Sequence, residues 1–78
     1  MQEIAIQLRS FQGIQDFVSI ATAKPFPVTV GSRDYRVSAT SLMGMFGLDY
    51  TQPLLLHSEC TDDQWTRFSQ ELKPFLAP

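Results

Sequence analysis

The sequence contains a single cysteine, Cys60, and a single histidine, His57, among its 78 residues. One thiol cannot form an internal disulfide, and one cysteine with one histidine is too small a ligand set for zinc, so we predict no metal site. Lysine and arginine total 6, form no cluster and are outnumbered by 8 acidic residues, which gives a formal charge of −2. Nucleic-acid binding through phosphate contacts is therefore disfavoured.

Long apolar runs are also missing. No segment approaches the length of a membrane span, and the polar pair Gln2-Glu3 precedes only a short apolar run, which is unlike a secretion signal. We find no acid and base paired at recognisable spacing and no phosphate-cradling glycine loop, so we predict neither enzyme activity nor a cofactor. These observations favour a protein of the reducing cytoplasm.

Hydrophobic residues make up 44% of the chain, which allows one core and a single domain spanning residues 1–78. Alternation with period two predicts strands, helical spacing of apolar residues predicts helices, and Pro and Gly mark the breaks between them. The expected elements are strand 3–8, helix 11–23, strands 26–30 and 35–37 joined by a turn at 31–34, a short helix after 41, strand 54–60, and a helix that begins after 61 and ends near 73.

The order of these elements, βαββαβα, predicts the fold class. Every strand except 54–60 has one strongly apolar face, so all three helices must cover one face of a four-stranded antiparallel sheet. Residues 54–56 are apolar on both faces, which indicates that their strand is central in the sheet. The prediction is an α+β open-faced sandwich.

Ser10 is a plausible N-cap of the first helix, and Thr61 with Gln64 forms a capping box before the last one. His57 is expected to face solvent from its strand. The buried face of the first helix is expected to comprise Phe11, Ile14, Phe17, Val18 and Ala21.

The stretch Ser41-Leu42-Met43-Gly44-Met45-Phe46-Gly47-Leu48 predicts a helix of roughly two turns, which is too short to be stable alone. Ser41 is a natural N-cap, and Gly47 can supply the left-handed residue that ends the helix. The apolar residues are too many for one buried stripe, so some should reach solvent as a methionine-bearing surface for a protein partner. The candidates are Leu42, Met43, Met45 and Phe46; the alternative is that all four belong to the core.

The same stretch resembles the Ser-Ile-Met-Gly-Val-Met-Ser-Leu block of the HPr family, the small phosphocarriers of the bacterial sugar phosphotransferase system. Residues 31–37 loosely resemble the family's Tyr-Asn-Gly-Lys-Glu-Val hairpin, and residues 17–22 resemble the first-helix segment that follows its active site. The resemblance covers nearly the whole chain. It implies a βαββαβα sandwich with a four-stranded antiparallel sheet, in agreement with the element order.

The family's active-site block, Gly-Ile/Leu-His-Ala-Arg-Pro, is absent. Counting back from Phe17, Ser10 stands where the resemblance places the phosphorylated histidine, and Gln12 stands in the arginine's place. A phosphohistidine passes its phosphate on because its bond to nitrogen is weak, whereas a serine phosphate ester is stable. Ser10 is therefore a cap or a phosphate acceptor, not a relay. With Gln12 in the arginine's place, no fixed cation remains there to bind a phosphoryl group through two hydrogen bonds. Arg9 is the nearby cation that could substitute for it.

The resemblance also implies that Ser41 is a candidate for regulatory phosphorylation, because a kinase modifies the matching serine in the family's Gram-positive members. A phosphate there would meet free amides and the positive end of a helix dipole. Simple capping by Ser41 is the alternative. At His57 the resemblance places no catalytic group.

Three functions remain in competition. The first is a phosphocarrier-like protein that has lost the relay and acts as a regulatory interaction module toward phosphotransferase-system proteins or a regulator. The second is an active carrier that uses another residue, for which His57 is the only imidazole. The third is a plain interaction module unrelated to sugar transport.

Overall fold

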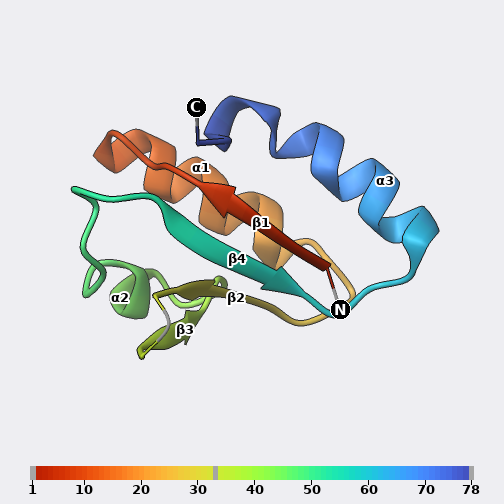
Figure 1. Cartoon of the computed structure of the whole chain (residues 1–78), viewed down its shortest axis with the longest axis horizontal. Helices are drawn as coiled ribbons and strands as arrows, with labels where there is room; N and C mark the ends of the chain where they lie inside the picture. Colours follow the sequence, from red (N-terminus) through yellow and green to blue (C-terminus); the bar gives the residue numbers. More distant parts are fainter. Residues whose placement is uncertain (1, 33, 78) are drawn as a thin grey trace.

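The computed structural model describes residues 2–32 and 34–77, and it folds as a sheet with helices packed against one face (Figure 1). Arg33, in the turn predicted at 31–34, lies outside the described residues. The elements are β1 (Gln2–Ile6), α1 (Phe11–Thr22), β2 (Val28–Gly31), β3 (Arg36–Ser38), α2 (Leu42–Met45), β4 (Leu54–Ser58), α3 (Asp62–Glu71) and a 3-10 turn, η1 (Lys73–Phe75).

The sheet has four strands in the order β1-β4-β2-β3, and every neighbouring pair is antiparallel. β4 is interior, as its apolar residues on both faces predict, and Leu56 is 0% exposed. The α+β open-faced sandwich with three helices and a four-stranded antiparallel sheet is therefore confirmed.

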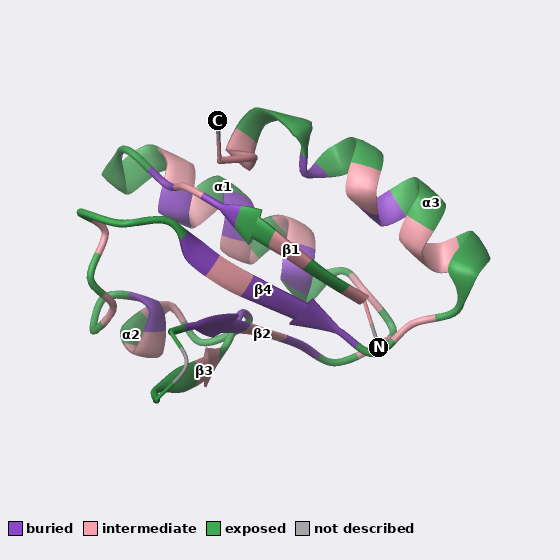
Figure 2. Cartoon of the chain, in the orientation of Figure 1, coloured by how far each residue is buried: buried purple, intermediate pink, exposed green. Residues whose placement is uncertain are grey.

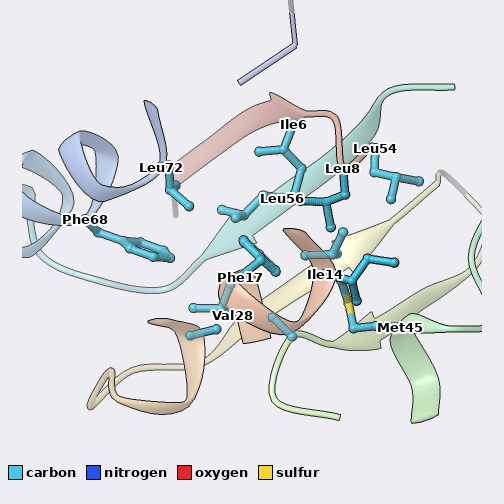
Figure 3. Close-up of a cluster of buried hydrophobic side chains, with 13 residues drawn as sticks. Ile6, Leu8, Ile14, Phe17, Val28, Met45, Leu54, Leu56, Phe68 and Leu72 are labelled. Atoms are coloured by element: carbon cyan, nitrogen blue, oxygen red, sulfur yellow. The ribbon is translucent and has the colours of Figure 1, made fainter. Parts of the chain in front are cut away.

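The core lies between the sheet and the helices, where the buried faces of β1, β4 and α1 meet (Figures 2 and 3). Burial of these side chains supplies most of the folding free energy of so small a domain. The members that are less than 2% exposed and largest in volume are Phe17, Phe68, Ile6, Met45, Leu56, Leu72 and Val30.

The predicted helix starts are confirmed at α1 and α3. The Ser10 hydroxyl accepts a hydrogen bond from the Gly13 amide, and Thr61 and Gln64 form both halves of a capping box. Near the C-terminal ends of the two helices, the Lys24 ammonium forms an ion pair with the Glu71 carboxylate. These contacts fix where α1 and α3 begin and how their far ends meet.

Two local predictions were wrong. Phe11 was expected on the buried face of α1 but is 60% exposed, because the first turn of the helix projects past the core and its ring packs on another ring instead. Gly47 was expected to be left-handed, yet no described glycine has a positive φ. The amides of Gly47 and Leu48 donate to the carbonyls three residues earlier, so the chain leaves α2 through tight turns that need no left-handed residue.

The segment 75–77, which we call the C-terminal strap, lies along the outer edge of β1. The Gln7 amide donates to the Phe75 carbonyl at 2.7 Å, and the Ala77 amide donates to the Ala5 carbonyl at 3.2 Å. The Phe75 ring meets the Phe17 ring edge-on at a centroid distance of 5.8 Å. The strap therefore pairs antiparallel with β1 and is anchored on α1.

Candidate functional site

Ser10 caps α1 and Gln12 lies in its first turn; these are the residues on which the sequence resemblance places the HPr family's histidine and arginine. The Ser10 backbone is extended, and its Oγ accepts from the Gly13 amide at 3.0 Å. The Gln12 Nε2 donates to the Asp16 carboxylate at 2.9 Å, one helical turn away. Both side chains are engaged within the helix itself, as a cap and a surface pair, and neither supplies a nucleophilic nitrogen or a cation.

Next to the cap, α1 and α2 meet through two aromatic rings. Phe11 and Phe46 stack with centroids 5.3 Å apart and ring planes 14° from parallel. The Phe11 and Phe46 rings remain 60% and 42% exposed, respectively, although aromatic side chains of this size contribute most when a core or an interface buries them. The sequence analysis did not predict that Phe11 belongs to this surface. Its position as the first helical residue, directly after the Ser10 cap, was the one indication that it lies at the end of the helix and not over the sheet.

The short helix α2 divides its apolar residues between core and solvent. Met43 is 84% exposed and Leu42 is half-buried, but Met45 is 0% exposed, because it faces the sheet. Met45 therefore cannot contact a partner, and its inclusion among the partner-binding candidates was wrong. The Tyr50 hydroxyl donates to the Met45 carbonyl and holds the end of the helix in place.

Ser41 caps α2 as predicted, with its Oγ accepting from the Gly44 amide at 3.1 Å. A Cβ built at Gly44 would lie 3.2 Å from the Val37 Cβ, so the absence of a side chain there lets α2 approach β3 closely. This close approach orients the opposite side of α2, with Met43, toward solvent.

These observations define an aromatic surface made of Phe11, Met43 and Phe46, with Leu42 at its margin. A shallow hollow beside it is lined by Leu8, Arg9, Ser10, Phe11, Ile14 and Tyr50. Burial raises the pKa of Tyr50, so its hydroxyl stays protonated and keeps donating to α2 at neutral pH. The aromatic surface therefore lies on two helix ends that are each fixed by a side-chain hydrogen bond, by Ser10 at the start of α1 and by Tyr50 at the end of α2.

His57 does not face solvent as expected; it is 6% exposed. β4 has a strand on each side, and its neighbours in register, Glu3 and Thr29, cover the imidazole on the face opposite the helices. The His57 Nδ1 lies 3.1 Å from the Glu3 carboxylate. Ser10 follows the other end of β1, so the imidazole and Ser10 are separated by about 10 Å of strand as well as by the sheet.

The loop after α2 contains an anion whose pKa is perturbed. The Thr51 hydroxyl and the Thr51 amide both donate to the Asp49 carboxylate, at 2.6 and 3.0 Å, and these bonds hold the pKa of Asp49 below its ordinary value. Within residues 2–32 and 34–77, no three His, Cys, Asp or Glu side chains gather where they could hold a metal ion. No helix in the described ranges is long and apolar enough to cross a bilayer.

No protein-family model matches this chain, and no curated protein is significantly similar to it. Among solved structures, it is similar to the crystal structure of HPr-C-His from Thermoanaerobacter tengcongensis, with a TM-score of 0.73 and 22% sequence identity. The match covers 92% of this chain and 90% of that one. At this identity the likeness shows the fold, so the HPr-like fold that the resemblance implied is confirmed.

Proposed function

We propose that this chain is a phosphocarrier-like protein that has lost the phosphate relay and works as an interaction module in the bacterial cytoplasm. Its partners would be phosphotransferase-system proteins or a regulator of that system, and its contact area would be the aromatic surface. On this proposal it catalyses no reaction and needs no cofactor or metal.

The exposed stack of Phe11 on Phe46 is the observation that carries the proposal. Rings that stay exposed to solvent add little to the folding stability of a monomer, whereas large aromatic side chains are the usual anchors of protein interfaces. The stack also lies one residue from Ser10, so a partner that covers it would cover the end of α1. A protein with a phosphocarrier-like fold could thus still bind its protein partners without transferring phosphate.

The chemistry at Ser10 supports the loss of the relay. A serine ester would not pass phosphate onward, and Gln12 is bonded to Asp16. Incubation with phosphoenolpyruvate and the general phosphotransfer enzyme, followed by intact-mass analysis, is expected to add no acid-labile phosphate. The appearance of an acid-labile phosphate would refute the proposal.

Docking is tested separately by capture of phosphotransferase-system proteins from a bacterial extract. The double substitution Phe11→Ala/Phe46→Ala is expected to abolish capture, while Arg67→Ala, an exposed change on α3, leaves it unchanged. If both variants capture equally well, the aromatic surface is not the contact area. If no phosphotransferase component is captured by the natural chain, the plain interaction module becomes the better description.

An active carrier that uses His57 is the weaker candidate, because the imidazole is buried against Glu3 on the far face of the sheet. Regulatory phosphorylation of Ser41 remains a separate proposal, supported by its exposure beside the aromatic surface. Intact-mass analysis of protein purified from its own host, with location of any phosphate, tests it. Recovery of unmodified protein under all growth conditions would count against it.

A further inference from the structure

The outer edge of β1 is a second surface that the proposed docking does not use. Ile6 forms an isolated antiparallel bridge with Leu76, and the flanking bonds join Gln7 to Phe75 and Ala5 to Ala77. The backbone groups of Ala5 and Gln7 therefore point away from β4, and by strand alternation those of Glu3 do as well. The strap occupies only the half of this edge nearest α1.

The strap is attached less firmly than the strands. It follows the 3-10 turn η1, two backbone bonds hold it to β1, and residues 75–77 are all partly exposed. The Phe75 ring is its one aromatic anchor. Phe75 and Leu76 pack against the core but stay partly exposed, so opening of this segment loses few fully buried contacts and costs less than global unfolding.

The edge beneath the strap is complementary to itself. In an antiparallel pair of two copies centred on Ala5, Ala5 would lie opposite its own equivalent, and Glu3 would lie opposite the equivalent of Gln7. No like charges oppose each other, and the outward amides and carbonyls of three residues per copy would pair. On the core face, Ile4 would lie opposite the equivalent of Ile6, which continues the apolar layer.

We propose that the C-terminal strap keeps the chain monomeric by covering the β1 edge, and that its release lets β1 pair with β1 of a second copy. The contact is isologous, so one two-fold axis closes it and no fibre results. An unprotected strand edge of this kind is a known route to self-association, and covering it with a segment of the same chain blocks that route.

The test uses the full chain with two substitutions in the strap, Phe75→Ala/Ala77→Pro. The first removes the ring anchor, and the second removes the amide that donates to Ala5, while β1 itself keeps all its groups. Sedimentation velocity and light scattering are expected to give about twice the monomer mass at high protein concentration, against a monomer for the natural chain. Circular dichroism checks that the variant is folded.

Substitutions at Ala5 then locate the contact. Ala5 is exposed in the monomer, so Ala5→Lys leaves the fold intact but puts two ammonium groups opposite each other across the axis. Added to the strap variant it is expected to restore the monomer, whereas the matched Ala5→Ser keeps the dimer. A folded strap variant that stays monomeric, or a dimer indifferent to Ala5→Lys, would overturn the proposal.

If the strap variant does not fold, hydrogen exchange of the natural chain tests whether the strap opens separately from the rest of the domain. The Gln7 amide is expected to exchange at least an order of magnitude faster than the Leu56 amide of the central strand, because it opens with the strap. Equal protection of the two amides would mean that the strap opens only with the whole domain, and would contradict its role as a separable cover.

Discussion

At the scale of a single residue, the Ser10 hydroxyl serves as the N-cap of α1. Its Oγ meets the Gly13 amide at 3.0 Å, which satisfies one of the free donors at the start of α1. The bond is intrahelical and complete without any ligand. The side chain therefore has a full structural explanation, independent of phosphate chemistry.

Replacing Ser10 by Ala should lower the free energy of unfolding by about 1 kcal/mol, because the Gly13 amide loses its acceptor. Ser10→Asp should retain most of the stability, since a carboxylate also caps and favours the positive end of the helix dipole. Urea unfolding of the three proteins measures both effects. Equal stability of Ser10→Ala and the natural chain would show that the cap contributes nothing.

The Asp49 carboxylate gives a prediction about pH. Its pKa is held below the ordinary value by the Thr51 hydroxyl and amide, so these bonds stabilise the loop above the ordinary pKa and are lost as the pH falls through the lowered one. Thr51→Val removes the hydroxyl and should raise the pKa of Asp49 toward its ordinary value. An NMR titration of the carboxyl carbon measures it; an unchanged titration would contradict the assignment.

At the scale of elements, α2 shows how four residues can be a stable helix only through its contacts. It is capped by Ser41, packed against β3 at Gly44 and bonded by Tyr50 at its end. Its apolar residues therefore serve two purposes, with one side in the core and the other forming half of the aromatic surface.

The two methionines of α2, Met43 and Met45, test this division. Met45→Ala should cost about 2–5 kcal/mol of unfolding free energy, because a side chain that is 0% exposed is removed from the core. Met43→Ala, at 84% exposure, should change stability by less than about 0.5 kcal/mol. Thermal unfolding compares the two variants, and similar losses in both would contradict the burial difference.

Glycines at two turns give a second matched pair. A Cβ at Gly31 would lie 2.1 Å from the Tyr35 carbonyl oxygen, so Gly31→Ala should strain the β2–β3 hairpin and cost about 1–3 kcal/mol. A Cβ at Gly47 would have no atom nearer than 3.4 Å, and the residue is not left-handed, so Gly47→Ala should be neutral or stabilise by up to about 1 kcal/mol. A clear loss at Gly47 would argue for a left-handed conformation after all.

The elements themselves were predictable from local patterns, because alternation, helical spacing and caps are properties of short segments. The strand 54–60 was correctly expected to be central, since Leu54, Leu55 and Leu56 are apolar in succession. Apart from Gly47, the errors at His57 and Phe11 fell on residues whose environment depends on distant neighbours. His57 is buried by β1 and β2, and Phe11 lies outside the core, where it stacks on Phe46 from the end of α2.

At the scale of the whole molecule, the fold joins two helix ends that are far apart in sequence into one surface. Helical spacing alone could not have predicted the contact of Phe11 with Phe46, because it arises from how α1 and α2 pack on the sheet. The likeness to the HPr-C-His structure, which covers 92% of this chain, shows that the arrangement of these elements follows that fold.

Introducing a histidine and an arginine at the start of α1 tests the proposed loss of the relay. The double substitution Ser10→His/Gln12→Arg should gain acid-labile phosphate from phosphoenolpyruvate and the general phosphotransfer enzyme, if docking has been retained. Gln12→Arg alone should gain none, because Ser10 still holds the acceptor position. Intact-mass analysis before and after mild acid reads the result, and equal phosphate on the natural chain would contradict the proposed loss of the relay.

The direction of the C-terminal strap has a practical consequence for attaching reporters to this protein. From Phe75 to Ala77 the chain runs antiparallel to β1, away from Gln7 and the cap that follows it. Ala77 lies toward the end of β1 that is remote from Phe11, so a label or domain attached at this end of the chain is expected to leave Phe11 and Phe46 accessible to a binding partner. The same attachment would lie next to the strap that covers the edge of β1, so the self-association of any fusion protein should be measured as well.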